Sequence, residues 1–168
     1  RAPGGDFVLS LGPAALPLLV VITEIGVRTD RMTPAGAAAM VGAGLTNMWS
    51  MYGTNDIPSV LISYFGGIPN AKTLPLYLER SAMSHIDKVT TPTLILHGAQ
   101  DERVPVGQAL ELYRGLKDRG KATELVFYPR EGHGISEYYH QKDRMQRIYD
   151  WVTKYTLGDA GTRTSAQQ

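Results

Sequence analysis

Residues 93–101 read TLILHGAQD, and this stretch decides the fold. Its first five residues form an apolar run that predicts a buried strand, and a polar loop follows the strand. Residues 105–119 then carry apolar side chains at helical spacing, and Gly120 is a favourable helix stop. Residues 124–128 are the next apolar run. The order strand, helix, strand predicts two parallel strands of one sheet, with the helix covering a face.

The same alternation extends in both directions from this core. We expect further strands at residues 7–11 and 37–41, and further helices at residues 13–25, 73–81 and 136–156. Residues 45–70 have no clean periodicity, so they predict short helices and loops over the mouth of a site. The predicted fold is α/β, with a mostly parallel sheet of about four strands and helices on both faces.

Three regions follow from this pattern. Residues 37–157 hold the predicted α/β region, residues 1–36 form an atypical strand-helix segment, and residues 158–168 predict a small, polar, disordered tail. A sheet of about four strands leaves one edge or face incomplete, and an exposed inner strand favours association. We therefore expect a homo-oligomer, formed for example by exchange of segments between copies.

Composition excludes several classes of function. The chain has 168 residues, of which 43% are hydrophobic and 20% charged, as in one ordinary globular domain. A net charge of +1 gives no reason to expect nucleic acid or an anionic membrane as a partner. The apolar stretch at residues 16–25 is too short to span a bilayer. Cysteine is absent, which excludes disulfides and thiolate chemistry; we favour the cytoplasm among the open compartments.

An acid and a histidine follow two successive predicted strands. Asp101 lies after the first strand and His133 lies 32 positions later, after the second. In parallel sheets, ligands bind beyond the carboxyl ends of the strands, where both side chains are expected. A carboxylate there can orient the imidazole and stabilise its charged form while the ring takes a proton from a serine. We expect Gly132 and Gly134 to let the histidine loop turn tightly. The alternative is a solvated turn and an ordinary loop histidine.

Seven short motifs give this arrangement a family resemblance. From about residue 37 to residue 155, roughly 70% of the chain, the sequence resembles the C-terminal half of the catalytic domain of the prolyl oligopeptidase family, in particular its acylaminoacyl peptidase and dipeptidyl aminopeptidase-like members. The motifs are VGAGLTN at 41–47, MYGT at 51–54, YFGG at 64–67, DKV at 87–89, TPTLILHG at 91–98, DERVP at 101–105 and YPREGHG at 128–134. The resemblance implies a partial α/β-hydrolase fold, with Asp101 as the catalytic acid and His133 as the catalytic base.

The expected serine nucleophile is not visible. The family carries it in a Gly-x-Ser-x-Gly-Gly turn shortly before the strand that matches Ala38, but the corresponding residues 13–20 contain no hydroxyl. Ser10 lies inside a predicted strand, where it would point into the sheet or its packing, so we do not expect it to be the nucleophile. Ser63 lies in the insert at residues 45–70, and we interpret it as structural. One hypothesis is that residues 1–36 are not family sequence, for example after a reading-frame change. Translation of the gene in another frame should then show the serine turn.

Other candidate sites are weaker. His97 is expected to pack at the edge of the core, and His85 and His140 are expected at the surface. Spacing of histidines and carboxylates suggests no metal site, and no cofactor is expected. The aromatic residues Trp49, Tyr52, Tyr64 and Phe65 are expected either to line an acyl pocket or to pack beneath the insert.

Three functional hypotheses remain. The first is a serine hydrolase of the prolyl oligopeptidase type that cleaves peptides or small esters. The second is an inactive hydrolase remnant that serves as an assembly or binding module, or a cloning product. The third has His133 activating water directly, with Asp101 behind it. The first two differ in one feature, which is a serine within hydrogen-bond reach of His133.

Overall fold

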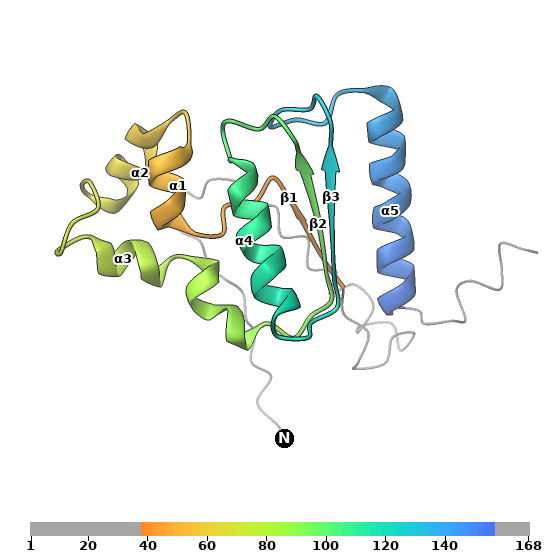
Figure 1. The fold of residues 1–168 in the computed structure, drawn as a ribbon, viewed down its shortest axis with the longest axis horizontal. Coiled ribbons are helices and arrows are strands. Elements are labelled where there is room, and N and C mark those ends of the chain that lie inside the picture. The colour runs from red at the N-terminus through yellow and green to blue at the C-terminus, as the bar shows by residue number, and fades with distance from the viewer. Residues whose placement is uncertain (1–37, 157–168) are drawn as a thin grey trace, which may run out of the picture.

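The computed structural model describes residues 38–156 of the chain, and Figure 1 shows how their helices and strands are arranged. In chain order the elements are β1 (Ala39–Gly42), α1 (Met48–Thr54), α2 (Pro58–Phe65), α3 (Leu74–Glu79), the 3₁₀ helix η2 (Ala82–Lys88), β2 (Thr93–Gly98), α4 (Val106–Lys117), β3 (Thr123–Tyr128) and α5 (Tyr138–Thr156). The strands and helices alternate along most of this order, as the sequence predicts.

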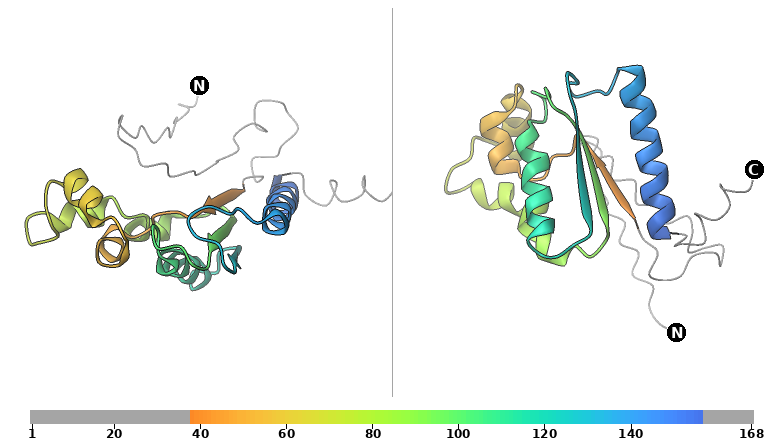
Figure 2. Two further views of the ribbon diagram at one scale, coloured as in Figure 1. Left: turned by 90° about the horizontal axis from the view of Figure 1, so that it is seen from above. Right: turned by 45° about the vertical axis from the view of Figure 1, so that its right-hand side comes forward.

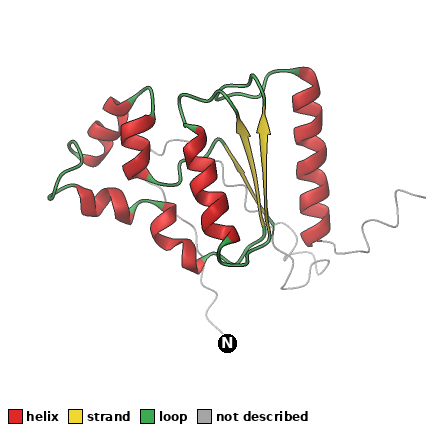
Figure 3. Cartoon of the chain, viewed as in Figure 1, coloured by secondary structure: helices red, strands yellow, loops and turns green. Residues whose placement is uncertain are grey.

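The described strands form one parallel sheet in the order β1-β2-β3 (Figure 3). β2 is central: its Ile95 pairs with Val41 on one side and with Leu125 on the other. All three strands run the same way, so their carboxyl ends lie at one edge of the sheet. The loops that carry Asp101 and His133 both leave from that edge.

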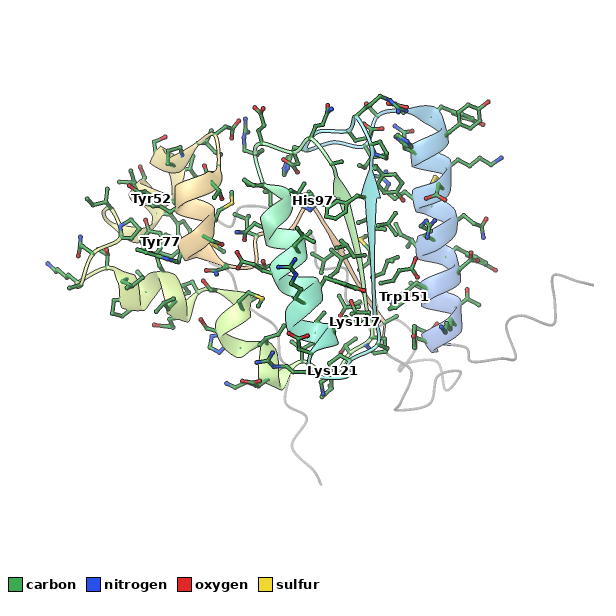
Figure 4. All side chains as sticks on the ribbon, in the orientation of Figure 1. Tyr52, Tyr77, His97, Lys117, Lys121 and Trp151 are labelled. Carbon is green, nitrogen blue, oxygen red and sulfur yellow. The ribbon has the colours of Figure 1, made fainter. Side chains whose placement is uncertain are left out.

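Helices cover both faces of the sheet, as the view from above in Figure 2 shows. Because side chains alternate along a strand, Leu94 and Leu96 of β2 pack on one face and Ile95 packs on the other. Trp151 of α5 covers the first face, and Figure 4 shows it pointing from the helix toward the strands. Leu116 of α4 covers the second face. Burial of each such apolar side chain contributes about 1.5–3 kcal/mol, so the two helices hold the sheet from opposite sides.

Helices α1, α2 and α3 form a separate cluster with its own small core. Tyr77 of α3 is fully buried and packs against Phe65 at a ring-centroid distance of 4.1 Å. Tyr52 packs edge-on against the Tyr77 ring at a centroid distance of 6.3 Å, and Figure 4 labels both residues in this cluster. The cluster is tied to α4 by the buried amide of Gln108, whose Oε1 accepts hydrogen bonds from the backbone N–H groups of Thr46 and Asn47.

Most predictions for these residues are confirmed. The parallel sheet, the helices on both faces and the stop at Gly120, which has a φ of 65°, are as expected. The predicted position of the insert is wrong, because α1–α3 lie beside α4 (Figure 1) instead of covering the end of the sheet. The strand at 7–11, the helix at 13–25 and the tail at 158–168 lie outside the described residues. Within 38–156, no helix combines the length and the apolarity that crossing a bilayer requires.

Candidate acid–base site

Asp101 is buried in the loop that leaves β2. Its side chain has no exposed surface, and its Oδ1 accepts a hydrogen bond of 2.9 Å from the backbone N–H of Val104. This bond closes a tight turn of the type that aspartate favours, in which the side chain accepts from a backbone group a few residues ahead. The turn leaves Oδ2 free to point toward the neighbouring loop.

His133 lies in that neighbouring loop, within hydrogen-bond distance of the acid. Its Nδ1 is 3.0 Å from Oδ2 of Asp101. A carboxylate accepts and does not donate, so Nδ1 carries the proton and Nε2 presents a lone pair when the ring is neutral. The imidazole is half exposed, and within residues 38–156 its Nε2 has no hydrogen-bond partner. The pair therefore combines a buried acid with a base that faces open space.

Glu131 anchors the histidine loop, and sequence reasoning missed it. The residue is 2% exposed, yet its carboxylate accepts hydrogen bonds from the backbone N–H groups of Ser136 and Glu137 and from Nδ1 of His140. These bonds, led by that of Ser136, lower the pKa of Glu131 to about 2. The available signal was its place two residues before His133. The carboxylate thus fixes the path between β3 and α5.

Gly98 allows the two loops to approach each other. A Cβ atom built at this position would overlap the backbone oxygens of Gly132 and Glu131. The same approach lets the N–H of Gln100 donate to the Glu131 carbonyl at 2.8 Å. The expectation that Gly132 and Gly134 permit the turn is wrong, because the left-handed residue of this loop is Arg130, with a φ of 65°. Close backbone packing, which sequence patterns do not display, makes glycine necessary at position 98.

An exposed ion pair connects the acid loop to the helical cluster. Arg103 donates from Nε to Asp56 Oδ1 at 2.7 Å and from a terminal nitrogen to Oδ2 at 3.2 Å. The hydrogen bond from Arg103 lowers the pKa of Asp56. The backbone N–H of Asp56 also donates to the Glu102 carbonyl. The link between α1 and α2 is thus the part of the insert that reaches the acid loop.

The remaining histidines differ in their surroundings. His97 is 1% exposed and lies at the end of β2 (Figure 4), as expected for the core edge. His85 is exposed and bonds to the Glu79 carbonyl, also as expected. The expectation of a surface position is wrong for His140, whose side chain is 17% exposed and faces Glu131.

The spacing of histidines and carboxylates in the sequence did not predict one group of possible metal ligands. Atoms of Glu131, Glu137 and His140 lie within 4.8 Å of one another. Internal donors already use both oxygens of Glu131, so these hydrogen bonds account for the cluster without a cation.

The four aromatic residues that were candidates for an acyl pocket fall into two groups. Tyr52 and Phe65 pack in the helical cluster, whereas Trp49 and Tyr64 are each 48% exposed.

Three serines of the described region form hydrogen bonds with groups other than His133. The hydroxyls of Ser50, Ser81 and Ser136 form hydrogen bonds with Gln108, Tyr77 and Glu131, respectively. Across residues 38–156, no serine forms a hydrogen bond with His133. A groove of about 320 Å³ nevertheless opens beside the imidazole, lined by side chains of β1, β2 and α5 and including Arg144. His133 is one of its lining residues, so the groove offers space beside this side chain.

Comparison with known proteins identifies the family. The model of the prolyl oligopeptidase family matches residues 33–159. The chain belongs to this family. Acylamino-acid-releasing enzyme 1 of Oryza sativa subsp. japonica is 30% identical over 165 residues, which cover 89% of this chain and 21% of the rice protein. The acylamino-acid-releasing enzyme of Arabidopsis thaliana is 32% identical over 138 residues, covering 78% of this chain and 18% of the plant enzyme. The chain thus spans about a fifth of the length of these relatives.

Solved structures agree on the fold. A puromycin-hydrolyzing peptidase of Mycobacterium tuberculosis superposes with a TM-score of 0.65 at 21% identity, over 70% of this chain and 18% of that one. The uncomplexed acylaminoacyl peptidase of Pyrococcus horikoshii gives a TM-score of 0.62 at 22% identity, over 71% and 20% of the two chains. The architecture of residues 38–156 is therefore part of an α/β-hydrolase fold.

Proposed function

We propose that this chain carries the acid and the base of a serine hydrolase that cleaves peptide or small ester bonds. The observation that carries the proposal is the 3.0 Å contact between Oδ2 of buried Asp101 and Nδ1 of half-exposed His133. Membership of the prolyl oligopeptidase family supports serine peptidase chemistry. The names of the plant relatives favour peptides with an acylated first residue as one substrate class.

Each residue has a definite role in the proposed reaction. Asp101 holds the Nδ1–H of His133, so that Nε2 takes the proton of a serine hydroxyl as its oxygen attacks the carbonyl carbon. The same Nε2–H then protonates the leaving amine or alkoxide. Asp101 stays ionised and stabilises the imidazolium between these two steps. In the deacylation half, His133 removes a proton from water in the same way and returns it to the serine.

Because no serine of residues 38–156 is hydrogen-bonded to His133, the proposed reaction takes its nucleophile from outside these residues. Ser10 is the nearest upstream serine in the sequence, and the groove beside His133 offers space for a serine-bearing segment. The boundaries at residues 36 and 157 remain predictions, as does the hypothesis that the first segment departs from the family. Direct activation of water by His133 remains the slower route if no serine reaches the ring.

A second function competes with the first. The chain would be an inactive hydrolase remnant that serves as an assembly or binding module. The observation that favours it is the engagement of Ser50, Ser81 and Ser136 with partners other than His133. β1 also pairs only with β2 among the described strands, which leaves one of its edges for another strand.

Labelling with a fluorophosphonate probe separates the two functions. The full chain is treated with the probe, and the modified residue is located by mass spectrometry, with His133→Ala as the control. Stoichiometric labelling of one serine, lost in the control, is the expected result for a hydrolase. Absence of labelling in folded protein contradicts the hydrolase proposal and favours the remnant.

Association and location are separate proposals. Among the described strands, β1 pairs on one edge only, which supports the prediction of a homo-oligomer. Light scattering after size exclusion measures the oligomeric state directly. A monodisperse monomer would contradict that prediction. A cytoplasmic location likewise stays a prediction, which cell fractionation with an antibody to the chain tests.

A further inference from the structure

A second histidine lies directly behind the candidate acid. Nε2 of His97 is 2.7 Å from the carbonyl oxygen of Val104 and 3.5 Å from Oδ2 of Asp101. Both side chains of this His97–Asp101 contact have no exposed surface. Both backbone polar groups of Val104 are therefore hydrogen-bonded to these side chains. Its N–H donates to Oδ1 of Asp101, and its carbonyl accepts from Nε2 of His97. The proposed reaction leaves His97 without a role.

The hydrogen bonds define which proton His97 carries. A carbonyl oxygen only accepts, so Nε2 must be protonated. Nδ1 is buried and has no partner within the described residues. An imidazolium would place a charged N–H in that unpartnered position, which is costly. Burial accordingly lowers the pKa of His97, and the ring is a neutral Nε2–H donor.

We infer that His97 is a positioning residue for the catalytic acid, an inference that rests on the proposed function of the Asp101–His133 pair. Its Nε2–H holds the Val104 carbonyl, and the Val104 N–H holds Asp101 Oδ1. This chain of bonds keeps Oδ2 aimed at His133. Nε2 also lies 3.5 Å from Oδ2, so the partial positive charge of its N–H group complements the carboxylate without placing a competing cation beside it.

Nitrogen NMR of the histidine rings tests this inference on the full chain. At alkaline pH, where imidazole is neutral, ring ¹⁵N shifts read through the carbon-bound protons distinguish the Nδ1–H form from the Nε2–H form. We expect neutral His133 to be mainly Nδ1–H and His97 to be Nε2–H. His97→Phe keeps a ring of similar size but removes the donor, and it should return His133 toward the Nε2–H form that a free imidazole prefers.

Two variants control for packing and for the donor itself. His97→Gln places an amide N–H near the position of Nε2 and should keep His133 in the Nδ1–H form. Phe127→Leu changes the ring packed 6.3 Å from His97 without touching the hydrogen bonds, and it should also leave His133 unchanged. Retention of the Nδ1–H form in folded His97→Phe would overturn the inference, as would loss of that form in Phe127→Leu to the same extent.

The failure of the inference is distinguishable from failure of the proposed function. If unsubstituted His133 shows no Nδ1–H preference and Asp101→Asn changes nothing, the acid–base pair itself is wrong. If the pair is present but His97 is protonated or is in the Nδ1–H form, only the positioning role is overturned. The protonation form of His97 is measured on the unsubstituted chain, so this test can overturn the positioning role even where a variant does not fold.

Discussion

The acid loop and the base loop leave the same edge of the sheet but are built differently. In the acid loop, Asp101 has no exposed side-chain surface and its turn is held by Val104 and His97. In the base loop, the buried group is Glu131, whereas His133 is half exposed. The acid loop buries the carboxylate of the acid–base pair. The base loop instead buries the Glu131 carboxylate that anchors it and exposes His133 to the groove.

This difference matches what each group would do in the proposed reaction. A carboxylate that orients an imidazole needs a fixed position and little water around it, because its interaction is stronger in a low dielectric. A base must exchange protons with other molecules, so Nε2 of His133 has to remain accessible. The comparison teaches that the side chain that anchors a loop and the side chain that the loop exposes for the proposed chemistry can be separate residues.

The largest effect is expected from Asp101→Asn. The amide of asparagine keeps the shape of the side chain, but its N–H group can donate a hydrogen bond to Nδ1 of His133. The substitution therefore favours the Nε2–H form of the ring, which cannot take a proton at Nε2. Labelling of the nucleophile by the fluorophosphonate probe should slow by about four orders of magnitude, the loss that this change causes in a serine protease. Time courses measured on both proteins give the ratio. A decrease below tenfold would contradict the role of Asp101.

Gly98→Ala should break both loops at once. Its methyl group would overlap the backbone oxygen of Gly132, which has no alternative rotamer. We expect a loss of about 3 kcal/mol in the free energy of unfolding, measured by urea denaturation. The matched control is Gly107→Ala in α4, where an added Cβ has nothing within 4 Å. Equal stability of the two variants would contradict the close approach of the loops.

Acid should weaken the two loops in different pH windows. Burial lowers the pKa of His97 below its ordinary 6.5, so the unfolded chain takes up this proton first and stability falls as the pH drops below 6.5. The pKa of Glu131 is lowered from 4.5 to about 2, so its contribution is present above pH 4.5 and is lost toward pH 2. Urea denaturation across this range measures both losses.

Two variants assign these windows. His97→Gln should remove the loss that begins below pH 6.5, and Glu131→Gln should remove the loss between pH 4.5 and 2 while lowering the melting temperature at neutral pH. A pH profile that neither substitution alters would show that other groups cause the acid sensitivity.

The smallest effect is expected from Arg103→Ala. The Arg103–Asp56 pair is exposed, and such pairs contribute little because water and salt screen them. The melting temperature should fall slightly at low ionic strength and match that of the parent chain in high salt. Arg130→Ala, which breaks the exposed pair with Glu137 in the base loop, is the matched comparison. A large loss in either variant would show that this ion pair holds its loop.

The sequence predicted the elements better than their positions. The apolar run at residues 93–97 became the central strand β2, because a strand buried on both faces has to be apolar throughout. The apolar stripe of α5 likewise packs on the sheet through Trp151. The insert at residues 45–70 was placed wrongly, since its contacts with α4 depend on Gln108, a polar residue whose burial no local pattern reveals.

By itself, the sequence determined the alternation of strands and helices and the loops that hold Asp101 and His133. Both follow from local periodicity, and parallel strands necessarily end at one edge of the sheet. Only the tertiary structure decided which side chains surround the pair. His97, Glu131 and Gly98 act through burial and close backbone contacts between loops far apart in the chain. Such contacts arise only when the sheet assembles, so the spacing of residues along the chain does not predict them.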